Sequence, residues 1–364
     1  MSYHRIVRAL EENPLTKFTL NIQGCLLMRW EDLGEDDLIR RIKKLIERGQ
    51  VELTGSCAYH VLAPLVPLDE VEKQIKENEE ILRKHFGADL KLRGFFFPEM
   101  AYGVDAAKLV KSLGYEWLIL DEISGTGRFG DIDFSKVYVD QNSNLKVIFR
   151  MRKLSQNFVP DILGNEARLA EYQNEQELYI TATDAELYGL RHIDHTAEFE
   201  KLLKKDDLET ETISEFIHDK KATKITVGPS NWEATEIEIT KGIPYALWSD
   251  PKNKIQKQLW KLTDLAYNVI KDNTDDDNAV WARWHFVRGL ASCTFWWASG
   301  RDLQLFGSVS WSPDEVERGI NEFIRAIRSL HNEETRSVKI KGEKLYIKIK
   351  QMIWSEHWEY HWKK

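Results

Sequence analysis

The chain has 364 residues, 42% of them hydrophobic, so it can bury a sizeable core and is not disordered throughout. Its 51 basic and 59 acidic residues give a net charge of −8, which argues against nucleic acid as the main partner. Cys25, Cys57 and Cys293 form no Cys-X-X-Cys pair, and no apolar run approaches the length of a membrane span, so we expect a cytoplasmic protein without membrane contact.

The first part of the chain alternates predicted strands with predicted helices. Amphipathic stretches follow the β-prone runs and end at Gly49, Gly87 and Gly114, as helices commonly do. Repeated β-α-β units of this length indicate parallel strands and an α/β fold, a (β/α) barrel-like domain or, alternatively, a doubly wound sheet. The predicted strands are 18–22, 50–54, 94–98, 117–120 and 178–183, the predicted helices are 36–48, 69–86 and 105–113, and a hairpin is predicted over 137–150.

A helical region follows the alternating part. Predicted helices cover 255–270, 280–295 and 313–330, and the segment 339–364 mixes two periodicities, with a helix favoured. We expect the tryptophans of the first two helices, Trp260, Trp281 and Trp284, to lie in the core. The predicted domains are therefore a barrel-like domain over 1–250, a helical bundle over 251–332 and a C-terminal segment over 333–364.

Two of the predicted strands end abruptly on an acid. The run Gly94-Phe95-Phe96-Phe97-Pro98 ends on Glu99, and the run that begins at Tyr179 ends on Asp184. In sheets and barrels of parallel strands, the loops at the carboxyl ends of the strands form the active face. A pair of carboxylates flanking a scissile bond is the minimum equipment for glycoside hydrolysis. The alternative is that each acid caps the helix that follows it.

Several segments of this chain, in their order, resemble the glycoside hydrolases of family 57, which act on α-glucans as amylases, glucanotransferases and branching enzymes. The resemblance extends over roughly residues 5–330, and the combination of segments is more specific than any one of them. The segments are Gly49-Gln50-Val51-Glu52-Leu53 with Tyr59-His60, Gly94 to Glu99, Thr183 to Gly189, Thr212 to Glu215, Asn231-Trp232-Glu233, Trp248 to Asn253, and Ser292 to Trp297.

This resemblance implies an incomplete (β/α)7 barrel and a retaining mechanism. It assigns the nucleophile to Glu99 and the general acid/base to Asp184. A retaining enzyme needs two carboxyl groups about 5–5.5 Å apart, one ionised to attack the anomeric carbon and one protonated to release the leaving oxygen. The predicted function is hydrolysis of, or transfer between, α-glucans, with an oligo- or polysaccharide as the partner.

Four further residues are predicted to contact the substrate: Glu52, His60, Glu186 and Trp232. Glu52 alternates with Val51 and Leu53 in a short strand, so its charge faces the opposite side and needs a protein partner or a sugar hydroxyl. Trp232 offers an aromatic face on which a sugar ring can stack. No cofactor and no catalytic metal are expected.

Two alternatives stay open. His192 and His195 could hold a metal, which would favour a metal-dependent polysaccharide deacetylase. The barrel could instead bind glucan without catalysis, because the family's first strand, with its His-Gln-Pro motif, has no counterpart here. On this ground we expect a chain truncated at its amino end and impaired in turnover.

Overall fold

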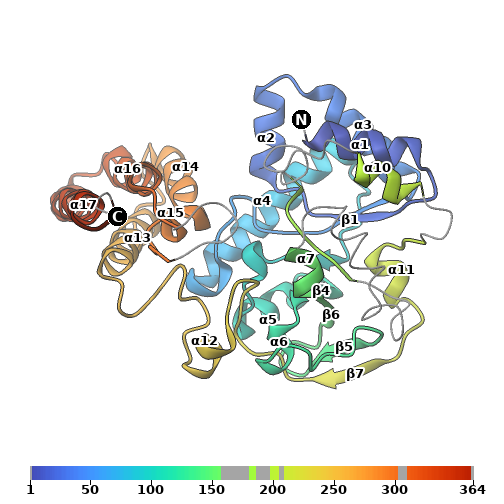
Figure 1. The fold of residues 1–364 in the computed structure, drawn as a ribbon. Coiled ribbons are helices and arrows are strands. Elements are labelled where there is room, and N and C mark those ends of the chain that lie inside the picture. The colour runs from blue at the N-terminus through green and yellow to red at the C-terminus, as the bar shows by residue number, and fades with distance from the viewer. Residues whose placement is uncertain (1, 157–179, 186–196, 205–208, 302–309, 362–364) are drawn as a thin grey trace. The chain divides into compact units, whose positions relative to one another are not determined.

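The computed structural model describes residues 2–156, 180–185, 197–204, 209–301 and 310–361 (Figure 1). The chain forms two compact units. The first comprises Met1–Ala58 and Ala63–Glu236, and the second comprises Tyr59–Leu62 and Ile237–Lys364. The predicted domain boundaries at 250 and 332 stay predictions. Within the described ranges, no helix is both long and apolar enough to cross a membrane.

The strands of the first unit are mostly parallel, as the alternating pattern predicted. The strands are β1 (Phe18–Leu20), β2 (Val51–Leu53), β3 (Gly94–Phe95), β4 (Trp117–Asp121), β5 (Val137–Asp140), β6 (Lys146–Arg150) and β7 (Ala222–Ile225). β1 pairs with β2, and a second sheet has the order β3-β4-β6-β5-β7. A parallel bridge between Gly55 and Phe95 links the end of β2 to β3. Among the strands that the structure describes, β5 and β6 are the one antiparallel pair, which confirms the predicted hairpin.

Helices follow most strands of the first unit, and the named elements in the described part of the second unit are all helical. Those of the first unit are α1 (Ser2–Glu12), α2 (Gly24–Asp32), α3 (Asp36–Glu47), α4 (Leu68–Phe86), α5 (Val104–Ser112), α6 (Ile123–Thr126), α7 (Arg152–Gln156), α10 (Glu198–Leu203) and α11 (Ile213–Ile217), with 3-10 turns at Ala63–Leu65 and Pro98–Met100. The second unit contains most of α12 (Glu236–Thr240), then α13 (Lys254–Lys271), α14 (Ala279–Gly289), α15 (Ser292–Trp296), α16 (Pro313–Ser329) and α17 (Arg336–Glu356), with a 3-10 turn at Glu333–Thr335 and a π-helical turn at His357–His361.

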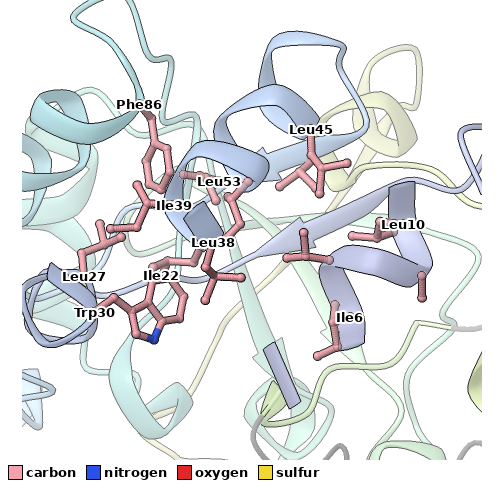
Figure 2. Close-up of a cluster of buried hydrophobic side chains, with 14 of the residues drawn as sticks. Ile6, Leu10, Ile22, Leu27, Trp30, Leu38, Ile39, Leu45, Leu53 and Phe86 are labelled. Carbon is pink, nitrogen blue, oxygen red and sulfur yellow. The ribbon is translucent and has the colours of Figure 1, made fainter. Parts of the chain in front are cut away.

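One hydrophobic cluster of the first unit shows why the amphipathic pattern folds as it does. The apolar stripe of α3 buries Leu38, Ile39 and Leu45, which Figure 2 shows beside Leu53 of β2 and near Phe86 at the end of α4. Fully burying such side chains contributes about 1.5–3 kcal/mol each. α1, which the sequence pattern did not indicate, adds Ile6, Val7 and Leu10 to the same cluster.

The helix predicted over 280–295 is wrong as a single element. α14 ends at Gly289 and α15 begins at Ser292. Between them Ala291 is extended, with φ −51° and ψ 132°, and forms an antiparallel bridge with Val61. A long-range backbone pairing therefore interrupts a run whose local pattern is helical throughout.

Two of the three tryptophans predicted for the core are on the surface. Trp281 is 58% exposed and Trp284 is 41% exposed, and the two rings meet edge to face on α14. Trp260 is half-buried and stacks on the buried Phe295, with 4.1 Å between ring centroids. Tryptophan content alone does not distinguish core from surface positions on a helix.

We expect Gly94→Ala to destabilise the protein by about 1–3 kcal/mol, because overpacking a filled site costs this much. A Cβ at Gly94 would lie 2.1 Å from Cζ2 of Trp117, which is fully buried on the neighbouring strand β4. Gly228→Ala is the matched control, since a Cβ there meets no heavy atom within 4 Å. Urea unfolding measures both, and equal unfolding midpoints for the two variants would contradict this packing.

Candidate active site

Glu99 lies in a strained turn, four residues beyond the end of β3. Pro98 keeps the preceding Phe97 extended, at φ −69° and ψ 128°, and Glu99 then adopts the left-handed conformation at φ 59° and ψ 15°. Met100 also has a positive φ, 47°. Non-glycine residues held in this region cost of order 1–3 kcal/mol each, and such strain clusters at functional sites. The Glu99 side chain is half-buried.

Trp232 holds Glu99 at two points. Its indole Nε1–H donates to Oε2 of Glu99 at 2.8 Å, and its backbone N–H donates to the Glu99 carbonyl at 3.1 Å. Both residues were singled out from the sequence, and the structure brings them together. A donor aimed at a carboxylate favours the ionised form and fixes the orientation of the group.

A buried ion cluster lies at the carboxyl ends of β4 and β6. Asp121 is fully buried and accepts from Nε of Arg150 at 2.8 Å and from Nη2 of Arg152 at 2.7 Å. The strand register pairs Asp121 with Arg150 directly. The remaining guanidinium N–H groups bind backbone carbonyls: Arg150 binds Ala182 and Trp232, and Arg152 binds Ala234 and Asn231.

Asp184 lies on the segment that Arg150 holds. Of the strand predicted over 178–183, residues 180–183 are described and are not a strand, although Met151 N–H donates to the Ile180 carbonyl at 2.8 Å. Arg150 Nη1 binds the Ala182 carbonyl at 2.9 Å. Asp184 itself is half-buried. One guanidinium thus contacts both the segment that carries Asp184 and the residue that contacts Glu99.

Glu233 is a third carboxyl group in this region, and it is not among the site residues predicted from the sequence. Burial raises its pKa above the ordinary Glu value. The positive charges of Arg152 and Arg150 oppose this shift, whereas the negative charges of Glu99 and Asp121 reinforce it. The site therefore combines an oriented carboxylate with a carboxyl group that holds its proton to higher pH.

Glu52 has protein partners. Its carboxylate accepts hydrogen bonds from the backbone N–H and the hydroxyl of Ser214 and from the hydroxyl of Thr19. The hydroxyl of Ser214 also accepts from Nε1 of Trp117 at 3.0 Å. These bonds balance the Glu52 charge near the start of α11, which is the first of the two possibilities that the strand pattern left open. A substrate contact of Glu52 stays a prediction.

Of the remaining site residues singled out from the sequence, only His60 is among those that the structure describes. His60 belongs to the second unit, where its carbonyl accepts from Ser292 N–H at 2.9 Å and its φ is 54°. Its predicted contact with substrate stays a prediction. Glu186, His192 and His195 lie outside the described residues. Within the residues that the structure describes, no three His, Cys, Asp or Glu side chains group as a metal site.

Comparison with known proteins decides the family. The model of glycosyl hydrolase family 57 matches residues 1–239. The chain belongs to this family. The fold class expected for family 57 is confirmed, since the mixed α/β fold with its partial parallel sheet and C-terminal helical region matches solved (β/α)7 barrel structures.

Relatives of known name are distant in sequence. The α-amylase of Pyrococcus horikoshii is 25% identical over 207 residues, which cover 55% of this chain and 32% of that protein. The 4-α-glucanotransferase of Thermococcus litoralis is 27% identical over 121 residues, which cover 33% of this chain and 18% of that protein. The chain thus spans about a third or less of the length of these curated relatives.

Solved structures of the family share the fold. An exo-type maltose-forming amylase from Pyrococcus sp. ST04 superimposes with a TM-score of 0.69 at 14% identity, covering 100% of this chain and 75% of that one. The 4-α-glucanotransferase of Thermococcus litoralis gives a TM-score of 0.68 at 15% identity, covering 91% and 56% of the two chains.

We expect Glu233→Gln to change the free energy of unfolding more favourably at neutral pH than at acidic pH. The raised pKa means that the folded state binds a proton at Glu233 more tightly than the unfolded state does. Stability therefore falls as pH rises above the ordinary Glu value of about 4.3, until the pH passes the folded-state pKa. Glutamine removes this loss, so the stability of the variant minus that of the wild type should increase from pH 4 to pH 7.

Urea unfolding across this range measures the difference. The matched control is Glu116→Gln, which changes an exposed acid at the amino end of β4. A stability difference that is flat, or that falls with pH, would show that Glu233 is not desolvated as described.

Proposed function

We propose that this family 57 chain carries a retaining site for α-glucans, with Glu99 as nucleophile and Asp184 as general acid/base. The observation that carries the proposal is the 2.8 Å bond from the Trp232 indole N–H to Oε2 of a half-buried Glu99 held in a strained turn. A nucleophilic carboxylate must be ionised and fixed in direction, and this arrangement favours both. The α-glucan substrate is proposed because matching relatives are named α-amylase and 4-α-glucanotransferase.

The reaction divides into two displacements. The Glu99 carboxylate attacks the anomeric carbon while protonated Asp184 delivers its proton to the leaving glycosidic oxygen, which breaks the glycosidic bond. Deprotonated Asp184 then removes a proton from water, or from a glucan hydroxyl, as that oxygen displaces Glu99. Water as acceptor gives hydrolysis, and a glucan hydroxyl gives transfer. The strained backbone of Glu99 and its two bonds to Trp232 support the first displacement by limiting the positions of the nucleophile.

The purified chain should show reduced but measurable turnover of soluble starch and maltooligosaccharides, and Glu99→Gln should reduce kcat further by about 10³-fold or more, the scale of losing a covalent nucleophile. Asp184→Asn should cost about 10²–10⁴-fold on glucans and much less on a glucoside with an activated leaving group, which needs no protonation. Glu116→Gln is the control, because it removes an exposed carboxylate at the amino end of β4. Reducing-end assays and product lengths measure turnover and separate hydrolysis from transfer.

The anomeric form of the first product tests the stereochemistry. Two displacements leave the α configuration unchanged, so NMR spectra at early times should show the α-anomer before mutarotation. The β-anomer as first product, or full activity of Glu99→Gln, would contradict the assignment. A chain without turnover on any α-glucan would favour the glucan-binding alternative.

We expect activity to survive exhaustive chelation, because two carboxyl groups supply both the nucleophile and the proton donor of this mechanism. The measurement is kcat on maltooligosaccharides before and after treatment with a chelator and dialysis. Loss of activity with rescue by zinc would contradict this mechanism and direct attention to His192 and His195, whereas zinc-dependent release of acetate from an acetylated polysaccharide would support the deacetylase alternative.

A further inference from the structure

We propose that Arg150 is a positioning residue, which acts through Trp232 to orient the Glu99 carboxylate and which also fixes the segment carrying Asp184. The inference rests on the proposed function and adds to it a residue that neither attacks nor protonates the substrate. The evidence for this role is that the single guanidinium group of Arg150 makes contacts in three directions.

The position of Arg150 is set by the sheet. The side chain of Arg150 is only 3% exposed, and its Nε donates to Asp121, directly opposite in the β4–β6 register. Both residues lie at strand ends with hydrogen-bonded neighbours, so the backbone leaves the guanidinium little freedom. A buried arginine with a buried partner is a rigid reference point for whatever its remaining donors bind.

Two donors and one face of the same group reach the site. Nη1 binds the Ala182 carbonyl at 2.9 Å, two residues before Asp184, and Nη2 binds the Trp232 carbonyl at 3.3 Å. The guanidinium plane also lies over the Trp232 ring, 5.0 Å from its centroid. Trp232 in turn donates its indole N–H to Oε2 of Glu99. Arg150 is therefore one step from each proposed catalytic residue, by different routes.

Only a guanidinium group suits this arrangement. Its planar fork supplies donors in fixed directions while its face stacks on an aromatic ring. A lysine ammonium is a compact point charge, which keeps the pairing with Asp121 but cannot also stack on Trp232 and bridge the two carbonyls. Arg150→Lys therefore keeps the charge and removes the geometry.

Arg152 is the matched control within the same cluster. It shares Asp121 as its partner, but its guanidinium lies over Phe129, 4.7 Å from the ring centroid, and its carbonyl partners are Ala234 and Asn231. Arg152→Lys also removes a guanidinium group from the buried ion cluster, but Arg152 contacts neither Trp232 nor the Ala182 carbonyl in the described structure. A merely structural role predicts the same result for both variants.

The test follows the Trp232 indole directly, with ¹⁵N-indole-labelled tryptophan in the full chain. The Trp232 N–H signal is assigned by its loss in Trp232→Phe, and its pH dependence in the wild type should vanish in Glu99→Gln. We expect Arg150→Lys to shift this signal and weaken its pH dependence, and Arg152→Lys to leave both near the wild-type values. Equal shifts in the two lysine variants, or none in either, would overturn the proposal.

A kinetic double-mutant cycle gives the second readout. Arg150→Lys should lower kcat on maltooligosaccharides by about 10²-fold with little change in KM, the scale of a misplaced reacting group. Its effect should be smaller, but not absent, in a Trp232→Phe background, because the route through the indole is then already lost while the contact with the Ala182 carbonyl remains. Effects on kcat that multiply independently would contradict action through Trp232.

Trp232→Phe keeps the test decisive if Arg150→Lys does not fold. Loss of one hydrogen bond to a charged group should move the acid limb of kcat/KM upward by about one to two pH units. Residual activity of Glu99→Gln shows whether the acid limb belongs to Glu99. This control is needed because Glu233, Asp121 and the two arginines are further charged or titratable groups at the site. An unmoved acid limb would overturn the role of the indole. If the wild type turns over no α-glucan, the proposed function fails, whereas the NMR experiment still tests the positioning.

Discussion

The site depends on one buried carboxylate and the two arginines that surround it. Asp121 is fully buried, and Arg150 and Arg152 both donate to it. Removing charges from water is costly, and such a cluster persists only when its hydrogen-bonding groups are satisfied. Here other N–H groups of the two arginines donate to backbone carbonyls, including those of Trp232 and Ala234. These hydrogen bonds offset the desolvation cost, and their acceptors lie in a loop.

As a result, the loop that carries Trp232 is held in position as firmly as a strand would be. The segment from Asn231 to Ala234 pairs with none of the described strands, yet carbonyls along it bind guanidinium groups anchored at the ends of β4 and β6. Of these contacts, those of Arg150 with the Trp232 carbonyl and ring place the indole against Glu99. It also brings Glu233 close enough to Glu99 for the two negative charges to influence each other. A site built from a loop thus acquires the rigidity of the sheet.

Much of the fold was predictable from the sequence because its signals are local. The apolar stripe of α3 and its stop at Gly49 specify a helix on their own, and Gln141 to Asn144 mark the hairpin turn. The failures came from long-range contacts. The pairing of Ala291 with Val61 divides a run that is helical by pattern, and the exposure of Trp281 and Trp284 depends on which helix face the bundle covers.

The residues of the site also divide into those with a local sequence signal and those whose properties depend on distant parts of the chain. Glu99 was predictable because an acid directly after an apolar run is a local signal, and Trp232 because a family motif carries it. Asp121 and Arg150 also end apolar strands, so the same local signal marks them. Glu233 was not predictable as a proton-holding group, because its pKa depends on burial and on charges distant in sequence.

Mechanism-based trapping tests the identity of the nucleophile most directly. A fluorinated α-glucosyl substrate, which forms the covalent intermediate but slows its hydrolysis, is incubated with the wild-type chain, and the labelled peptide is sequenced by mass spectrometry. The account predicts a single glycosyl ester on Glu99, in the peptide that contains Phe95 to Met100. A label on Glu233 or Asp184 instead, or no label while the chain still cleaves α-glucans, would contradict it.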